Sequence, residues 1–332
     1  MRLGVLSGGA GDDWRLTLEK IKVLDDLGIE IVSVGESWGR SAVPWLATLA
    51  THTSKITVGT SILNVFSRTP AAIAQDFAML EELSGGRMLL GLGSSGEYMV
   101  ENYHGVPFDR PLQRLREYVQ IFDQLIAGEP CDYDGEVFKL SGGFKIQYHR
   151  PRTKVPVLIA AISPKSIHQT GEVADGVIPI HWPVHLFKQL RDDLEAGARD
   201  AGRSGHVFQI NPHMHVDILD GTEDDAAKWR EARRQIQHYI NRMGTVYAHM
   251  LERNGYEDEV HASQAAWAAR DAEASIAAIS DDMVRAAQCI GSLDEVREQL
   301  KERAAVVDIQ MLYMPHSDDP KAIGHWFESL MK

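Results

Sequence analysis

The sequence predicts an α/β protein with the (β/α)8 architecture of a TIM barrel and a helical insertion before the last strand. Short apolar runs rich in β-branched residues alternate with segments of helical length, which is typical of βα units on a parallel sheet. Eight alternations of this kind favour a closed barrel over a doubly wound sheet. Because such barrels reach about 250 residues or more as one unit, we predict a single domain over residues 1–332.

The predicted strands are short runs of Val, Ile, Leu and Thr between turn-forming residues. They cover residues 2–7, 31–36, 56–63, 88–93, 155–161, 176–180, 208–219 and 308–313. Amphipathic segments follow at 14–27, 43–52, 70–84, 112–127, 166–173, 187–201 and 321–331. Pro70 suits the first turn of its helix, and Gly85 with Gly86 suits the end of the same helix.

Two segments depart from the βα alternation. Residues 131–148 shift toward a period of two around Gly135 and Gly142, which predicts a β-hairpin that covers one rim of the barrel. Residues 223–303 have a helical pattern with breaks at Gly255 and Ser280. Because this stretch is too long for one crossover helix, it predicts an inserted helical subdomain.

Composition and charge narrow the range of partners. The chain carries 47 acidic and 34 basic residues, a net charge of −13, and no Lys/Arg-rich block, so nucleic-acid binding is not expected. No apolar stretch approaches the ~18 uncharged residues of a membrane helix, and the first residues lack the pattern of a signal peptide. We therefore expect a cytoplasmic protein without membrane contact.

Cysteine and histidine spacing does not predict a metal site. Cys131 and Cys289 are the two cysteines, and because they lack CxxC spacing, each is expected to be a buried, inert thiol. His213 and His215 share one strand face, but no acidic or cysteine partner stands at a familiar ligand spacing. We predict that no metal is bound.

Candidate catalytic residues lie just past the predicted strands, because the active site of a (β/α)8 barrel forms at the carboxyl ends of its strands. Glu36 follows the second strand, Glu97 the fourth and His181 the sixth. Each carries a group that can take part in proton transfer. For Glu36 a second interpretation stays open, namely an N-cap or a salt bridge on the rim.

Three strand ends have sequences suited to a cofactor. Residues 91–96, GLGSSG, look like a dinucleotide fingerprint, but no helix begins at once and no acidic residue ends a second strand about 20 positions on. Their small side chains leave room for a flat ring. Residues 60–64 change polarity in a way that fits a bulge. At 160–165, backbone N–H groups, Ser163 and Lys165 suit a phosphate, with plain helix capping by Ser163 as the alternative.

In these stretches the chain resembles the luciferase-like monooxygenase family, in the subgroup of coenzyme F420-dependent oxidoreductases. The similar segments are 35–40 (GESWGR), 58–75 (VGTSILNVFSRTPAAIAQ), 80–118, 158–180 and 242–244 (RMG), in the same order and over nearly the whole chain. The resemblance implies a deazaflavin or flavin ring in the barrel mouth, backed by a bulge with a non-prolyl cis peptide. The matching bulge is Thr60-Ser61-Ile62, with Ser61–Ile62 as the expected cis bond.

The resemblance also implies a phosphate-binding turn at 161–165 and a cofactor turn at 93–97. The residues that we assign to the cofactor on this basis are Ser61, Ile62, Asn64, Gly93, Ser94, Ser95, Ala161, Ile162, Ser163 and Lys165. Several deazaflavin-dependent members carry an Asp-His pair at the end of strand two, where this chain has Glu36 and Ser37. A histidine that acts there in substrate protonation therefore has no counterpart.

We expect an oxidoreductase that transfers a hydride between coenzyme F420 and a small-molecule substrate, with Glu36, Glu97 and His181 in acid-base roles. Two alternatives stay open, an FMN-dependent monooxygenase that uses reduced flavin and oxygen, and a non-catalytic, cofactor-free binding protein. A homodimer or homotetramer is expected. The loops that select the substrate are expected near Trp38, Tyr98 and Trp182.

Overall fold

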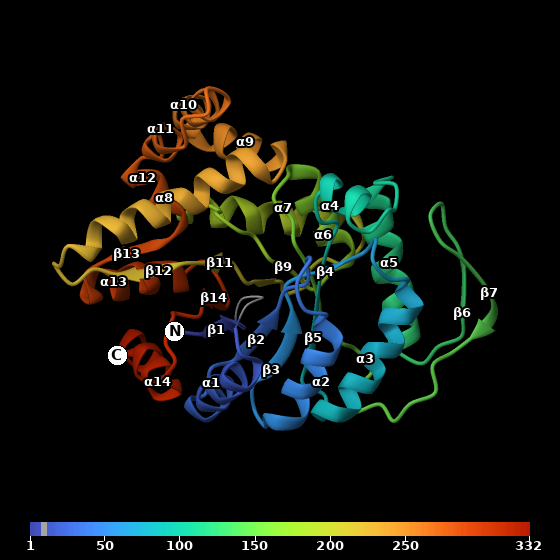
Figure 1. Ribbon diagram of the computed structural model, residues 1–332. Helices are drawn as coiled ribbons and strands as arrows, with labels where there is room; N and C mark the ends of the chain where they lie inside the picture. Colours follow the sequence, from blue (N-terminus) through green and yellow to red (C-terminus); the bar gives the residue numbers. More distant parts are fainter. Residues whose placement is uncertain (8–11) are drawn as a thin grey trace.

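A parallel β-sheet curls on itself at the centre of the computed structural model, which describes residues 1–7 and 12–332 (Figure 1). The strands neighbour one another in the order β10, β9, β8, β5, β3, β2, β1, β14 and β11. Their bounds are β1 (Leu3–Leu6), β2 (Ile31–Val34), β3 (Thr57–Thr60), β5 (Met88–Gly93), β8 (Val157–Ile159), β9 (Gly176–Val177), β10 (Gln209–Ile210), β11 (His213–Met214) and β14 (Gln310–Tyr313).

The run 209–214 closes the sheet into a barrel. Its first part, β10, pairs with β9, while its second part, β11, pairs with β14. A parallel bridge between Ile180 and His213, with the His213 N–H donating to the Pro179 carbonyl at 3.0 Å, joins the same run to the end of β9. The predicted (β/α)8 barrel is confirmed.

Helices cover the outside of the barrel, with their apolar faces on the strands. They are α1 (Trp14–Leu27), α2 (Ala42–His52), α3 (Pro70–Ser84), α5 (Pro111–Ile126), α6 (Pro164–Val173), α7 (Phe187–Asp200), α13 (Leu293–Ala304) and α14 (Pro320–Met331). Local sequence sets their ends: Thr69 accepts the Ala72 N–H at the start of α3, and Gly85 ends that helix in the left-handed conformation. Among the residues that the structure describes, none of the helices is long and apolar enough to cross a membrane.

The predicted hairpin segment forms the antiparallel pair β6 (Cys131–Asp134) and β7 (Lys139–Phe144). Glu117 of α5 is fully buried and its carboxylate accepts the N–H groups of Glu136, Val137 and Phe138 at the turn, at 2.7 to 3.2 Å. The hairpin therefore stands beside α5, outside the helix layer (Figure 1), and the expectation that it covers a rim of the barrel was wrong.

The insertion carries its helices on the side toward which the barrel strands point (Figure 1). They are α8 (Asp224–Arg242), α9 (Thr245–Leu251), a π-turn at Glu252–Tyr256, α10 (Glu257–Ala268), α11 (Ala272–Ala277) and α12 (Asp281–Ala287). The predicted helical subdomain over 223–303, with breaks at Gly255 and Ser280, also contains a strand that was not predicted, β13 (Cys289–Gly291), which pairs in parallel with β12 (Val216–Ile218). Three residues are too few to show strand periodicity, and β12 was mistaken for the end of a barrel strand.

Candidate active site

The bulge in the third barrel strand is built by hydrogen bonds to both neighbouring strands. β3 ends at Thr60, the Ser61–Ile62 peptide bond is cis as the resemblance implies, and β4 (Leu63–Asn64) then pairs with β5. Thr60 Oγ1 donates to the Gly91 carbonyl at 2.8 Å and accepts the Gly91 N–H at 2.9 Å. On the other side, the Ser61 N–H donates to the Val34 carbonyl at 2.8 Å.

The glycines at the end of β5 make room for this bulge. A Cβ atom at Gly91 would lie 2.0 Å from the Thr60 carbonyl oxygen, and one at Gly93 would lie 2.9 Å from Ile62 Cδ1. The space that we expected at Gly93 for a flat ring is thus occupied by the Ile62 side chain. The glycines of the run 91–96 were interpreted as room for a cofactor ring, but Gly91 and Gly93 are required by the packing of the neighbouring strand.

Glu36 forms an ion pair with Arg68. The guanidinium bonds both carboxylate oxygens, with Arg68 Nη2 2.8 Å from Glu36 Oε1, and the Ala42 N–H at the start of α2 donates to Oε1 at 3.1 Å. Burial alone would raise the pKa of Glu36, but the hydrogen bonds from Arg68 and Ala42 outweigh it and hold the pKa below its ordinary value. The geometry supports the salt-bridge interpretation of Glu36 and leaves a poor proton donor at neutral pH.

The turn after β5 projects into solvent. Ser95 adopts the left-handed conformation with φ of 58°, Ser94 Oγ donates to the Ser95 carbonyl at 3.2 Å, and Glu97 begins the short helix α4 (Glu97–Asn102). Glu97 is exposed and its carboxylate has no hydrogen bond or ion pair within residues 1–7 and 12–332. Tyr98 beside it is 83% exposed, so this turn offers a free carboxylate and an uncovered aromatic ring.

The turn after β8 leads directly into α6. Ser163 and Ser166 form a reciprocal capping box, in which the Ser163 N–H donates to Ser166 Oγ at 3.0 Å and the Ser166 N–H donates to Ser163 Oγ at 3.2 Å. Ala161 and Ile162 are buried, whereas Lys165 is exposed and forms no ion pair among the described residues. Capping occupies Ser163, which leaves the Lys165 ammonium as the free cation of this helix start.

His181 is buried beneath the insertion. It lies in the left-handed conformation with φ of 52°, is 3% exposed, and makes an edge contact with Tyr239 of α8 at a centroid distance of 4.6 Å. Burial lowers its pKa to about 3, with a smaller contribution from the neighbouring histidines, so the imidazole is neutral at physiological pH. Its Nε2 has no hydrogen-bond partner in the described part of the chain.

Further rings at the barrel mouth were not predicted as site residues. His215 stacks on Tyr313 at 3.8 Å, and Tyr239 packs edge-on against Tyr247 at 4.7 Å. Burial lowers the pKa of His213 to about 4 and that of His215 to about 3. The sequence showed the histidine pair on one strand face, but nothing in it placed α8 over that face.

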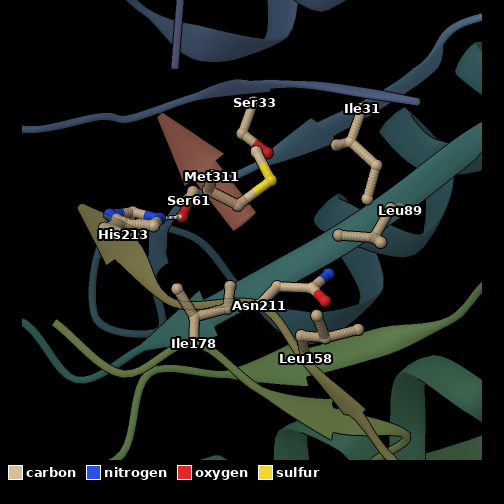
Figure 2. Close-up of a pocket in the computed structure, with 9 residues that line it drawn as sticks. All are labelled: Ile31, Ser33, Ser61, Leu89, Leu158, Ile178, Asn211, His213 and Met311. Atoms are coloured by element: carbon tan, nitrogen blue, oxygen red, sulfur yellow. Dashed lines mark hydrogen bonds between the residues drawn. The ribbon is translucent and has the colours of Figure 1, made fainter. Parts of the chain in front are cut away.

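A small cavity of about 10 Å³ lies inside the barrel beside the bulge (Figure 2), about the room of one water molecule. Ser61 Oγ and His213 Nε2 form a hydrogen bond at its edge. The residues that line it are Ile31, Ser33, Ser61, Leu89, Leu158, Ile178, Asn211, His213 and Met311. Among the residues described, no group of three His, Cys, Asp or Glu side chains stands close enough to hold a metal ion.

Three buried donors at these strand ends lack a partner within the described chain. They are Asn64 Nδ2, His181 Nε2 in its donor tautomer, and Trp182 Nε1. Buried polar atoms are nearly always hydrogen-bonded, so unpaired ones in residues at the strand ends are candidates for a bond to a polar ligand. The polar edge of a deazaflavin or flavin ring supplies matching acceptors, and these residues fit such a group.

The protein is a (β/α)8 barrel with a carboxylate, an imidazole and unpaired polar atoms after its strands, where enzymes of this class place their active sites. The chain matches the model of the family described as luciferase-like monooxygenase over residues 1–308, and it belongs to that family. The family resemblance and the expectation of an enzyme are confirmed.

Among the similar proteins are two relatives and one solved structure that each cover most of the chain. A Mycobacterium tuberculosis protein named as a candidate coenzyme F420-dependent oxidoreductase is 30% identical over 299 residues, 85% of each chain. A 5,10-methylenetetrahydromethanopterin reductase of Archaeoglobus fulgidus is 28% identical over 291 residues, 85% of this chain and 84% of the other. The coenzyme F420-dependent tetrahydromethanopterin reductase of Methanopyrus kandleri shares the fold, with a TM-score of 0.80, 24% identity, and coverage of 98% of this chain and 96% of that one.

Proposed function

We propose that this enzyme transfers a hydride between coenzyme F420 and a small organic substrate. The observation that carries the proposal is the set of unpaired buried polar atoms at the ends of the strands beside a bulge with a cis peptide. The name of the M. tuberculosis relative supports the same cofactor, and that of the A. fulgidus relative, a reductase, supports the class of reaction. When bound, the deazaflavin supplies the two-electron chemistry, and the protein binds, orients and moves protons.

Residues of three strand ends would hold the cofactor. Ser61 and Ile62 form the wall behind the ring, and Asn64 Nδ2 is the unpaired donor on the same strand. Gly93 borders this wall, since a Cβ atom there would lie 2.9 Å from Ile62 Cδ1. Ser94, Ser95, Ala161 and Ile162 follow the neighbouring strands, and the Lys165 ammonium suits a phosphate group. The Ser163 hydroxyl is engaged in its capping box, so a phosphate there would rely on Lys165 and its backbone N–H.

Glu97 is the proposed proton-handling residue, and His181 is proposed to hydrogen-bond the substrate as a neutral imidazole. Glu97 is free and solvent-exposed, so it can exchange protons with water. His181 is neutral, with an unpaired Nε2 in a buried position, so it can donate or accept one hydrogen bond at the substrate without carrying charge. Glu36, committed to Arg68, is assigned the role of anchoring the start of α2.

Cofactor choice is tested by titrating the apoprotein with oxidised F420 and, separately, with FMN, following the quenching of tryptophan fluorescence. We expect saturable F420 binding that is at least about tenfold tighter than FMN binding, a difference of about 1.4 kcal/mol. Tighter FMN binding would replace the proposal with a flavin monooxygenase. Binding of neither by a folded protein would indicate a barrel without this chemistry.

The proposed roles are tested with Glu97→Gln, which removes the carboxylate, and His181→Ala, which removes the hydrogen-bonding imidazole. Oxidation of reduced F420 is measured with the best acceptor from a panel of aldehydes, ketones and quinones. We expect Glu97→Gln to lower kcat by about a hundredfold, the usual contribution of acid-base catalysis, and His181→Ala to lower it by about tenfold, the value of one hydrogen bond, while the Kd for F420 changes little. Glu101→Gln, on the same short helix as Glu97, is the control and should retain activity. Full activity in both test variants would contradict the assignment.

A further inference from the structure

His213 lies behind the proposed cofactor wall, at a position that the proposed mechanism does not use. Its imidazole reaches across the barrel from β11 and hydrogen-bonds through Nε2 to Ser61 Oγ, the side chain of the first residue of the cis peptide (Figure 2). The two residues are 152 positions apart in the chain. This contact therefore joins the seventh barrel strand directly to the bulge.

The backbone of His213 is held on both sides. β11 pairs with β14, where His213 lies opposite Met311, and the His213 N–H donates to the Pro179 carbonyl at 3.0 Å. The ring also makes an edge contact with Tyr313 at a centroid distance of 6.2 Å. A side chain whose backbone is held in this way can keep the Ser61 hydroxyl in one rotamer.

The cavity beside Ser61 offers other partners for its hydroxyl. Ser33 and Asn211 line the same cavity, and Asn211 Oδ1 is buried without a hydrogen-bond partner among the described residues. Without the imidazole, the Ser61 hydroxyl can rotate toward these oxygens, and the backbone of the bulge loses a tether. With the imidazole in place, the Ser61 hydroxyl is bonded to His213.

We propose that His213 is a positioning residue that fixes the Ser61–Ile62 wall and so preorganises the site for the deazaflavin ring. The inference rests on the proposed function, since it assumes that the ring lies against this wall. His213 acts through Ser61, and a preorganised wall binds the ring more tightly because less order is lost on binding.

The test compares amides of different length at position 213. In His213→Gln the longer side chain can still reach Ser61, whereas in His213→Asn it is too short. We expect His213→Asn to raise the Kd for oxidised F420 about tenfold, the value of one hydrogen bond near 1.4 kcal/mol, and His213→Gln to stay within about threefold of the wild type. His52→Asn, which replaces an exposed histidine at the end of α2, is the control and should bind like the wild type.

A double variant separates positioning from general loss of packing. Ser61→Ala removes the other partner of the hydrogen bond. The Kd of Ser61→Ala/His213→Asn for F420 should therefore be no higher than the Kd of whichever single variant binds F420 more weakly. Multiplying effects would overturn the proposal, as would equal affinities of His213→Asn and His52→Asn. If the wild type binds F420 and His213→Asn binds it equally tightly, only this inference fails. If the wild type does not bind F420, the proposed function and the inference about His213 both fail.

Circular-dichroism melting of each variant identifies any loss of affinity that is caused by unfolding. Such a loss in both amide variants would also count against the positioning role of His213.

Discussion

Replacing Gly91 with alanine is expected to lower the free energy of unfolding by about 3 kcal/mol and to weaken cofactor binding. The added Cβ would lie 2.0 Å from the Thr60 carbonyl oxygen and 3.0 Å from Ile178 Cδ1. Because the nearest atom belongs to the backbone, no side-chain rotation relieves the clash. Thr60 must move, and it carries two hydrogen bonds to Gly91 and precedes the cis peptide.

The matched control for this prediction is Gly96→Ala, five residues further along the same segment. A Cβ atom at Gly96 meets no atom within 4 Å, and its φ of −96° suits any residue. Loss of a glycine N-cap costs less than about 1 kcal/mol, so Gly96→Ala should unfold close to the wild type in urea. Equal urea midpoints for the two variants would show that strand packing at the bulge does not need Gly91.

The barrel was predictable because each of its strands is buried on both faces. Runs such as 31–34 and 88–92 are apolar throughout or nearly so, and a turn and an amphipathic helix follow them. β13 was missed because it is three residues long and lies within helical sequence. Its partner β12 continues the apolar pattern of β11, so nothing in the sequence shows that the chain leaves the barrel at residue 215.

The candidate site was predictable only in part, since its pairings join distant parts of the chain. The turn at 161–165 could be predicted from Ser163 and Pro164, which are local signals for the start of a helix. Glu36 meets Arg68, and Ser61 meets His213, only when the strands assemble into the barrel. The periodicity of the sequence does not show which side chains then become neighbours. Glu36 shows the consequence: its position after a strand suggested catalysis, whereas its partner gives it a structural role.

Acidification from pH 6 to pH 5 is expected to lower the free energy of unfolding of the apoprotein by about 3 kcal/mol. Burial holds the pKa of His181, His213 and His215 at about 3, 4 and 3, while the unfolded chain has the ordinary histidine pKa of about 6.5. Between these values the unfolded state binds more protons, so stability falls as pH falls, by about 1.4 kcal/mol per pH unit for each imidazole.

One carboxyl group works in the opposite direction. Burial, with repulsion from Glu231, raises the pKa of Asp217 to about 6, so between pH 6 and pH 4 the folded state binds the extra proton and gains stability on acidification. Asp217 therefore offsets about one of the three imidazoles. Urea unfolding at pH 7, 6 and 5 tests the balance: Asp217→Asn should steepen the loss, and His181→Gln should reduce it. A pH-independent urea midpoint between pH 6 and pH 5 would show that the three histidines are not buried as neutral groups in solution.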